Sequence, residues 1–403
     1  MKSAIKFFFL AIALLFLTGT GECFAKRMSD ARINAELMKL MEANKVPGMT
    51  MVWMKGDKPI FQTALGVRDL QTGEPIELDD YFRIASISKT FVGAAVQQLV
   101  DEGKISLDTP AEDILGYTFR NPRYPEIPIT IRQLLSHTSS MRDFGLGPWY
   151  KDDRYVNPNK TTKDTIKMMF FDYAPGQGFK YCNRALNMMG VIIEKVSGER
   201  FDEYIRKHIL EPAGITNAGF NNDMLDQSKK VSLYNYNKKS GGMEWNDGYK
   251  RTNEKRVAAG KYRMGRDAFY WSPTGGMKIS SPELAKWMKT LQNGGVAPNG
   301  NRILSAEAVR RMTTPLTPCT GRKDWAFYGM TCFTGYNIIK GVTLKGHGGS
   351  ARGLKSIMVF NPESDWGFVC ICSGHNGAHT EDDVPNCYYD LVNFVYSQLK
   401  AEL

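Results

Sequence analysis

The chain has 403 residues, of which 42% are hydrophobic and 23% are charged, and its formal net charge is +10. This composition is typical of a globular protein and excludes a disordered, fibrous or low-complexity chain. The basic residues are scattered and form no nucleic-acid motif, so we expect no nucleic-acid partner, while association with an anionic cell envelope stays open.

The N-terminus has the order of an export signal. Residues 1–6 carry two lysines, residues 7–17 form an apolar run, and the small residue Ala25 follows. We therefore interpret the first 25 residues as a signal peptide that is cleaved near Ala25, which predicts a periplasmic or secreted protein. An uncleaved anchor is the alternative, although the run is shorter than the roughly 20 residues that span a bilayer. Glu22 before Cys23 argues against a lipid-modified cysteine.

The first part of the mature chain predicts a helix, a hairpin and a second helix. Apolar residues recur with helical spacing over 30–46, and two short apolar runs at 49–54 and 60–65 flank a turn, as in a β-hairpin. Good helix formers fill 91–102 after a turn that contains Ser86. This pattern places Ser86 at the start of a helix.

The middle of the chain, residues 107–264, alternates short helical patterns with loops rich in Pro, Gly, Asn and Asp, which predicts a mainly helical inserted domain. We expect helices at 130–137, 161–170 and 183–197, and an irregular covering loop at 231–261.

The last third of the chain returns to a mixture of helices and strands. We expect helices at 280–293, 305–312 and 385–399, and a strand pair at 354–360 and 366–373. Strands from both ends of the chain then form one α/β (α+β) domain, made of 26–106 and 265–403.

The cysteines of the mature chain show no zinc-type spacing, so we expect no metal site. Cys319 and Cys332 flank a short segment and could pair if the protein is exported. Cys370 and Cys372 lie two apart in an apolar run and are expected to be buried on one strand face.

Ser86 and Lys89 are three residues apart, so their side chains share one face of the helix. A serine hydroxyl is a poor nucleophile until a base takes its proton, and an amine that burial keeps neutral can be that base. The same Ser-x-x-Lys spacing occurs at Ser3 and Lys6, within the export signal, and at Ser397 and Lys400, near the end of the chain. A capping serine beside a solvated lysine is the structural alternative at Ser86.

Two further patterns follow in order, Tyr181-x-Asn183 and His347-Gly348-Gly349. With them, the chain resembles the superfamily of serine β-lactamases and penicillin-binding proteins, in its class C-like branch of carboxypeptidases, esterases and β-lactamases. The resemblance covers nearly the whole mature chain and includes the segments 134–139, 174–183, 273–277 and 346–349. It implies a β-lactamase/transpeptidase-like fold, in which helices flank an antiparallel sheet.

By position, the resemblance makes Ser86 the acylated nucleophile. Lys89 and Tyr181 would share the proton transfers, and Asn183 would hold Lys89 and the substrate amide. His347 would lie beside Tyr181, where relatives carry Lys or His. Burial should lower the pKa of Lys89, and we expect His347 to gain positive charge near its ordinary pKa of about 6.5.

The oxyanion hole implied by the resemblance consists of the backbone N–H groups of Ser86 and Ser350. Gly349 would let substrate approach the strand closely. Arg352 lies two residues beyond Ser350, so it should project from the same strand face, either in a salt bridge or as a clamp for a substrate carboxylate.

Together these features predict an exported serine hydrolase that works through an acyl-enzyme without a metal or organic cofactor. Its substrate would be a peptide that contains a D-amino acid, or a small ester or amide. A class C-type β-lactamase is the first alternative, which the third motif disfavours, since efficient β-lactamases carry a lysine in place of His347. A catalytically silent penicillin-binding-like receptor is the second, and the oligomeric state stays open.

Overall fold

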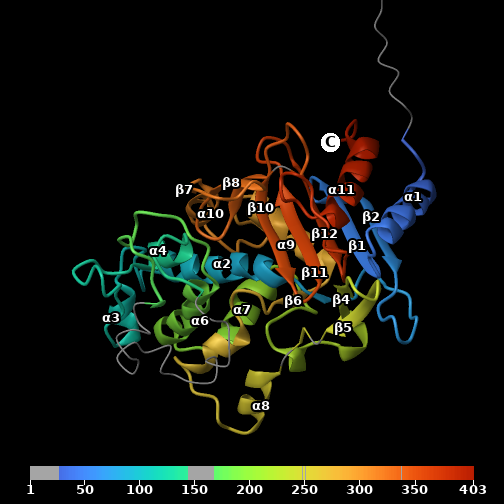
Figure 1. Cartoon of the computed structure of the whole chain (residues 1–403). Coiled ribbons are helices and arrows are strands. Elements are labelled where there is room, and N and C mark those ends of the chain that lie inside the picture. The colour runs from blue at the N-terminus through green and yellow to red at the C-terminus, as the bar shows by residue number, and fades with distance from the viewer. Residues whose placement is uncertain (1–26, 144–167, 247, 250, 337) are drawn as a thin grey trace, which may run out of the picture.

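The computed structural model describes residues 27–143, 168–246, 248–249, 251–336 and 338–403. A large antiparallel sheet forms one part of the molecule and a cluster of helices forms the other, with helix α2 (Ser88–Asp101) between them (Figure 1). The predicted signal peptide lies outside the described residues. No helix in the described part of the chain is long and apolar enough to cross a bilayer.

The sheet has eight strands in the order β2-β1-β12-β11-β10-β9-β8-β7, and the pairings between them are antiparallel. It joins both ends of the chain, since β1 pairs with β12 and Met51 faces Cys370. The strands are β1 (Gly48–Lys55), β2 (Lys58–Gly66), β7 (Thr317–Pro318), β8 (Trp325–Tyr328), β9 (Phe333–Tyr336), β10 (Lys345–Ala351), β11 (Leu354–Phe360) and β12 (Trp366–Cys372).

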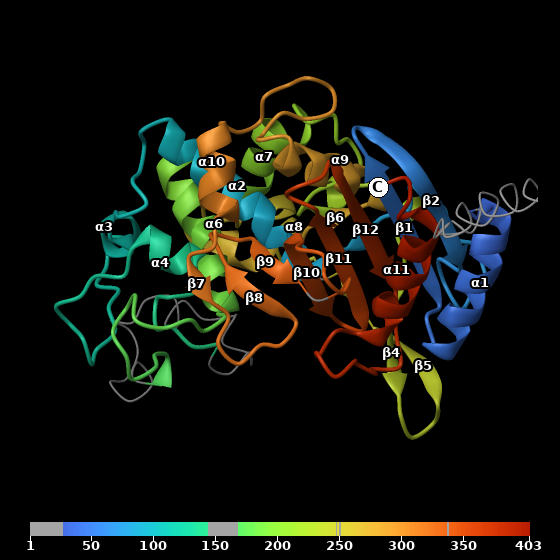
Figure 2. The same cartoon turned by 90° about the horizontal axis from the view of Figure 1, so that it is seen from above.

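Helices cover both faces of the sheet (Figure 2). On one face, α1 (Asp30–Ala43) and α11 (Asn386–Leu399) pack over a core that contains Trp53, whose ring stacks on Phe368 at 4.4 Å. Burial of each such side chain contributes about 1.5–3 kcal/mol. On the other face, α2, α9 (Ser281–Gln292) and α10 (Ala306–Thr313) belong to the larger core that the sheet shares with the helical part.

Helix α6 (Asn183–Ser197) is the centre of the helical part, and its residues 184–194 are all buried. It ends at Gly198, whose φ of 75° is the left-handed conformation that closes many helices. The helices around it are α3 (Ala111–Leu115), α4 (Ile131–Leu135), α7 (Phe201–Ile205) and α8 (Thr252–Ala258), with helical turns η5 (Arg206–Leu210) and η8 (Asp267–Trp271).

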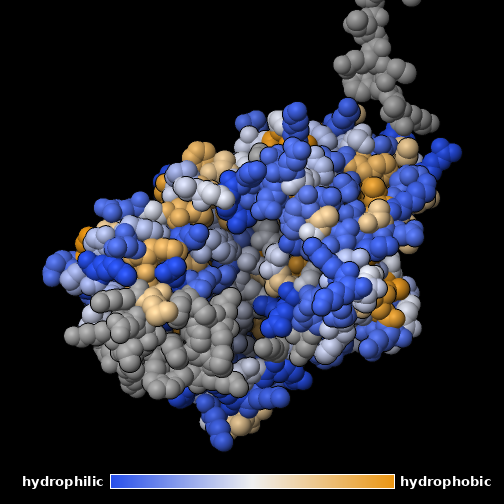
Figure 3. Space-filling view, in the orientation of Figure 1, coloured by the Kyte–Doolittle hydropathy of each residue, from blue (hydrophilic) through white to orange (hydrophobic). Residues whose placement is uncertain are grey.

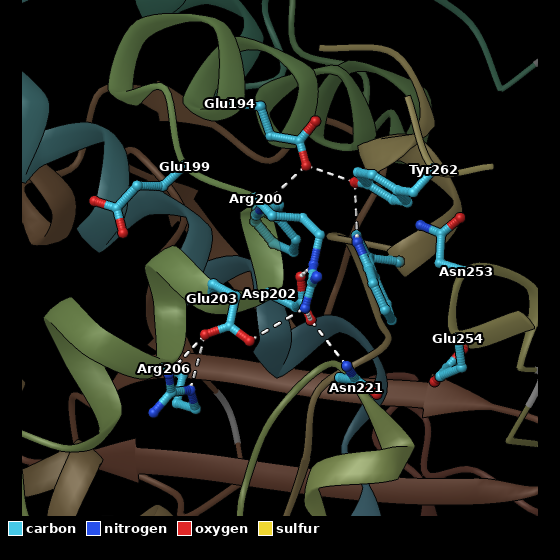
Figure 4. Close-up of polar contacts among 12 residues, drawn as sticks. Glu194, Glu199, Arg200, Asp202, Glu203, Arg206, Asn221, Asn253, Glu254 and Tyr262 are labelled. Atoms are coloured by element: carbon cyan, nitrogen blue, oxygen red, sulfur yellow. Dashed lines mark hydrogen bonds and ion pairs between the residues drawn. The ribbon is translucent and has the colours of Figure 1, made fainter. Parts of the chain in front are cut away.

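A buried polar network ties the end of α6 to the segment that follows α8 (Figure 4). The Glu194 carboxylate accepts hydrogen bonds from the Tyr262 hydroxyl at 2.5 Å and from the backbone N–H of Gly265 at 2.6 Å. Trp271 donates its indole N–H to Tyr262 at 3.0 Å. Burial raises the pKa of Glu194, so these donors hold a carboxyl group that would otherwise be costly to bury. The network fixes η8, which leads directly into the turn at 273–277.

Most of the expected helices and the first hairpin are confirmed within a few residues. The expected helix at 161–170 falls largely outside the described residues, and the domain boundaries stay a prediction. The expectation of an irregular loop at 231–261 is wrong, because the segment contains the hairpin β4 (Leu233–Asn237) and β5 (Gly242–Asn246) and helix α8. This hairpin joins the end of the sheet, since Tyr234 donates its backbone N–H to Ser373 O at 2.9 Å.

The six described cysteines are free thiols. Cys319 and Cys332, which the sequence would have allowed to pair, belong to two different hydrophobic clusters. Cys370 and Cys372 are buried as expected. The outer surface on the side shown in Figure 3 is mostly hydrophilic, with hydrophobic side chains in small separate patches.

Candidate active site

Ser86 lies in a short 3₁₀ turn, η1 (Ala85–Ile87), which leads directly into α2. The residue before it, Ala85, has a φ of 47°, a left-handed conformation that costs a residue other than glycine about 1–3 kcal/mol. The Ser88 hydroxyl donates to Ala85 O at 2.6 Å and accepts the N–H of Met277 at 3.1 Å, which holds this turn in place. The sharp turn leaves the Ser86 side chain partly exposed.

Lys89 is completely buried, and its amine lies among three oxygen atoms. Its Nζ is 2.9 Å from Ser86 Oγ, 2.9 Å from Asn183 Oδ1 and 3.0 Å from Thr274 O. Burial lowers the pKa of Lys89 to about 7, even though Asp143 favours the charged form. A substantial fraction of this amine is therefore neutral at neutral pH.

The three contacts determine where the lone pair of the neutral amine points. A neutral amine has two N–H bonds and one lone pair, and the oxygens of Asn183 and Thr274 can only accept hydrogen bonds. Because these two oxygens take the N–H bonds of Lys89, the lone pair faces the Ser86 hydroxyl. The geometry is that of a base beside its nucleophile.

Tyr181 also contacts the Ser86 hydroxyl. Burial raises the pKa of its phenol well above 10, although a hydrogen bond with Ser86 acts in the opposite direction. Its ring lies 4.8 Å below the Lys89 amine and stacks on Phe333 at 6.2 Å. Tyr181 therefore keeps its proton over the ordinary pH range, which suits a proton donor and leaves Lys89 as the base.

His347 is neutral, which corrects the expectation that it gains charge near pH 6.5. Its side chain is 1% exposed, and burial next to Lys89 holds its pKa well below the ordinary value. Its Nδ1 lies 2.6 Å from Gly348 O, and since a carbonyl oxygen only accepts, Nδ1 carries the proton. His347 Nε2 is then an acceptor, and it has no partner among the described residues. As expected, the ring lies near Tyr181, with centroids 6.3 Å apart.

A second neutral histidine, His137, packs against Tyr181 with ring centroids 4.2 Å apart. Its Nδ1 accepts the backbone N–H of Cys182 at 3.1 Å, and burial holds its pKa well below the ordinary value. Its Nε2 is buried and has no hydrogen-bond partner among the described residues, so His137 contacts this site through Nδ1 and its ring, which forms part of the wall around Tyr181.

Strand β10 passes directly beside the Ser86 turn. A Cβ atom at Gly349 would lie 2.3 Å from Ile84 O and 2.2 Å from Ser356 Oγ, so only glycine allows this approach. Ser350, one residue further, is exposed at the end of the strand. The oxyanion hole formed by the N–H groups of Ser86 and Ser350 stays a prediction.

The expectation that Arg352 shares a strand face with Ser350 is wrong. Strand β10 ends at Ala351, and Arg352 lies in the following turn with a φ of 56°. Its exposed guanidinium reaches Asn246 of β5 at 3.5 Å. The left-handed turn reverses the chain, so the alternation of side chains along the strand no longer applies.

Two residues near the site were not identified from the sequence. Arg322 lies over the ring of Phe333 at 5.3 Å, its charge interacts with Tyr181, and Asp324 pairs with it. Asp143 contacts the N-terminus of α6 beside Asn183. Both come from irregular segments, where neither periodicity nor a motif marks them.

The described residues contain one carboxylate cluster compact enough for a cation, formed by Glu77, Asp79 and Asp80. Lys229 Nζ already pairs with Glu77 at 2.5 Å and with Asp79 at 3.1 Å. None of these side chains takes part in the contacts around Ser86.

Comparison with known proteins gives the family of the chain. Residues 33–386 match the family model described as Beta-lactamase. Penicillin-binding protein 4 of Amycolatopsis lactamdurans is 27% identical over 344 residues, which cover 81% of this chain and 80% of the relative. Esterase EstB of Burkholderia gladioli is 29% identical over 208 residues, which cover 47% of this chain and 51% of the esterase.

Solved structures show the same fold. The octameric penicillin-binding protein homologue of Pyrococcus abyssi superposes with a TM-score of 0.71 at 24% identity, covering 93% of this chain and 78% of that one. The D-amino acid amidase of Ochrobactrum anthropi SV3, in complex with L-phenylalanine, gives 0.70 at 20% identity, covering 93% and 99%. The expected β-lactamase/transpeptidase-like fold is thus confirmed. The chain belongs to the beta-lactamase family, in the superfamily of serine β-lactamases and penicillin-binding proteins.

Proposed function

We propose that this protein is an exported serine hydrolase that forms an acyl-enzyme on Ser86. Its substrates would be peptides that contain a D-amino acid, or small esters and amides. The observation that carries the proposal is the Lys89 amine, 2.9 Å from Ser86 Oγ and with a pKa lowered to about 7. Burial keeps part of this amine neutral, and the neutral amine contacts the hydroxyl that it would activate.

In the proposed reaction, Ser86 Oγ bonds to the substrate carbonyl carbon while its proton passes to Lys89. The carbonyl oxygen takes the displaced electron pair and is stabilised by N–H groups at Ser86 and Ser350. When the bond to the leaving group breaks, Tyr181 gives that group its phenolic proton and is reprotonated from Lys89. Water then attacks the acyl carbon and passes a proton to the regenerated base, which gives it to Ser86 Oγ as the ester bond breaks and the carboxylic acid product leaves.

The substrate class is supported by the charges around Tyr181 and by the relatives. His347 offers a neutral acceptor, so it gives no charge attraction to a β-lactam carboxylate. Arg322 pairs with Asp324, and because its charge acts on Tyr181 it would place a cation near the group that leaves. The similar proteins include a penicillin-binding protein, an esterase and a D-amino acid amidase.

Substrate pairs test the proposal. We expect D-alanine p-nitroanilide to be hydrolysed faster than its L-isomer, and a p-nitrophenyl ester faster than nitrocefin, with both activities lost in Ser86→Ala. Ser397→Ala is the matched control, because Ser397 has the same spacing to a lysine but lies exposed on α11. Nitrocefin as the best substrate would favour the β-lactamase alternative, and no turnover of any substrate would favour a silent receptor.

Export is tested separately. Cleavage near Ala25 predicts that protein recovered from the periplasm or medium begins at or near Lys26. A mature chain that begins at Met1, or one that carries lipid on Cys23, would contradict the proposal.

A further inference from the structure

We propose that Asp143 is a positioning residue of this site, which acts through Asn183 to aim the lone pair of Lys89 at Ser86. The inference rests on the proposed function, because it concerns how the Ser86 hydroxyl is activated.

The Asp143 carboxylate binds the first residues of α6 through both oxygens. Its Oδ2 accepts the backbone N–H of Asn183 at 2.9 Å and the Asn183 side-chain Nδ2 at 2.8 Å. Its Oδ1 accepts the N–H of Arg184 at 2.9 Å and lies 3.4 Å from the Cys182 thiol. These contacts supply acceptors to helix N–H groups that have none within α6.

The carboxylate decides which way the Asn183 amide points. A carboxylate only accepts hydrogen bonds, so the amide nitrogen must face Asp143. The amide oxygen then faces Lys89, at 2.9 Å. If the amide turned over, its NH₂ group would face the amine and would compete with the Ser86 hydroxyl for the lone pair. The orientation set by Asp143 is therefore the one in which Lys89 can act as a base.

Asp143 is itself held in place by the segment that carries it. His137, at the start of this segment, accepts the Cys182 N–H at 3.1 Å and, through its carbonyl, the Lys180 N–H at 2.9 Å. At its other end, Arg142 donates its N–H to Met169 O at 2.9 Å. The segment from His137 to Asp143 thus contacts residues 180–184 at both of its ends, through His137 and through Asp143. These backbone and side-chain contacts hold the Asp143 carboxylate in place.

The charge of Asp143 has a second effect on the amine. The titratable and charged groups around Lys89 are Asp143, Cys182, Arg83, Tyr181, His137 and His347. Of these, Asp143 favours the charged amine most, and Arg83 acts against it. Loss of the carboxylate charge should lower the pKa of Lys89 by about one unit, which moves the acid limb of activity to lower pH. Loss of the Asn183 oxygen shifts it in the same direction.

The test is the rate at which a fluorophosphonate labels Ser86, measured from pH 5 to 9 in the full mature chain. We expect Asp143→Asn to reduce the plateau rate at least tenfold and to move the acid limb down by about one pH unit. A merely structural role would lower the amount of active enzyme but leave the limb in place. Asp172→Asn is the matched control, since this aspartate is 78% exposed and pairs only loosely with Arg123.

A double-mutant cycle shows whether Asp143 acts through Asn183. In an Asn183→Ala background, Asp143→Asn should change the plateau by less than about twofold. If Asp143→Asn does not fold, Asp143→Glu is used for the test. This variant keeps the negative charge, so the labelling rate should fall off over the same acid pH range as in the wild type, while the plateau rate should be lower. Unchanged labelling in the single variants, or additive losses in the cycle, would overturn the inference. Absence of Ser86 labelling in the wild type would instead overturn the proposed function.

Discussion

The lowered pKa of Lys89 predicts how the activity of the enzyme depends on pH. An ordinary lysine with a pKa of about 10.4 is neutral in only about 0.04% of molecules at pH 7. A pKa of about 7 makes roughly half of the Lys89 amines neutral at this pH. The neutral fraction then falls from about 0.9 at pH 8 to about 0.01 at pH 5, so the rate of acylation should fall about 90-fold.

This fall should follow the titration of one proton. His347 and His137 are neutral over the same range, because burial holds both pKa values well below 6.5. The logarithm of the rate should therefore fall with a slope of one per pH unit below neutrality. If His347 gained charge in this range, as its ordinary pKa would suggest, the slope would become steeper near pH 6.

The assay is kcat/KM for an uncharged p-nitrophenyl ester between pH 5 and 9, with the thermal unfolding temperature measured at each pH to exclude unfolding. Because the ester has no titratable group, the limb belongs to the free enzyme. A rate that is constant from pH 5 to 8, or a limb near pH 10, would refute the assignment of Lys89 as a buried neutral base.

Three substitutions test other parts of the site. Gly349→Ala places a Cβ 2.3 Å from Ile84 O, so we expect the free energy of unfolding to fall by about 1–3 kcal/mol and ester kcat/KM to fall at least a hundredfold. Gly348→Ala is the control, because a Cβ there meets nothing closer than 3.8 Å, and this variant should unfold at nearly the wild-type temperature. His347→Lys should raise nitrocefin kcat/KM about tenfold or more by adding a charge-assisted hydrogen bond, and an unchanged rate would contradict this role of the third motif. Arg322→Gln should reduce the preference for a peptide ending in a free carboxylate over its C-terminal amide by about tenfold, and an unchanged ratio would show that the cation does not contact the leaving group.

The burial of Lys89 lowers the free energy of unfolding of the protein. Between about pH 7 and 10, the unfolded chain binds a proton at Lys89 that the folded chain does not, so this residue makes unfolding harder as pH rises. Over the whole shift its burial opposes folding by about 4–5 kcal/mol, which the surrounding core must offset. The contact of Lys89 with Ser86 Oγ, and not this cost alone, distinguishes it from the buried Lys278, whose pKa is also lowered to about 7.

Local patterns were sufficient to predict much of the fold and the central pair. The spacing of Ser86 and Lys89, the apolar stripe of α6 and the two apolar runs that flank the turn between β1 and β2 are all set by residues close in sequence. Such features depend on local geometry alone, which the sequence carries directly.

Features that depend on tertiary packing could not be predicted. Strands β4 and β8 are short and partly exposed, so neither carries a strong apolar pattern, and β4 is joined to the sheet by the contact of Tyr234 with the distant Ser373. The charge state of His347 depends on burial, which no motif reports. Asp143 reaches Asn183 only because the chain folds back over 40 residues, so neither its contact nor its role has a local signal.

The most direct test of the account is the identity of the acylated residue. The mature protein would be treated with a fluorophosphonate probe and digested, and the adduct would be mapped by mass spectrometry, with Ser86→Ala treated in parallel. We expect one adduct, on Ser86, that is absent from the variant and forms more slowly below neutral pH. Label on another serine, or equal label in Ser86→Ala, would contradict the assignment of Ser86 as the nucleophile.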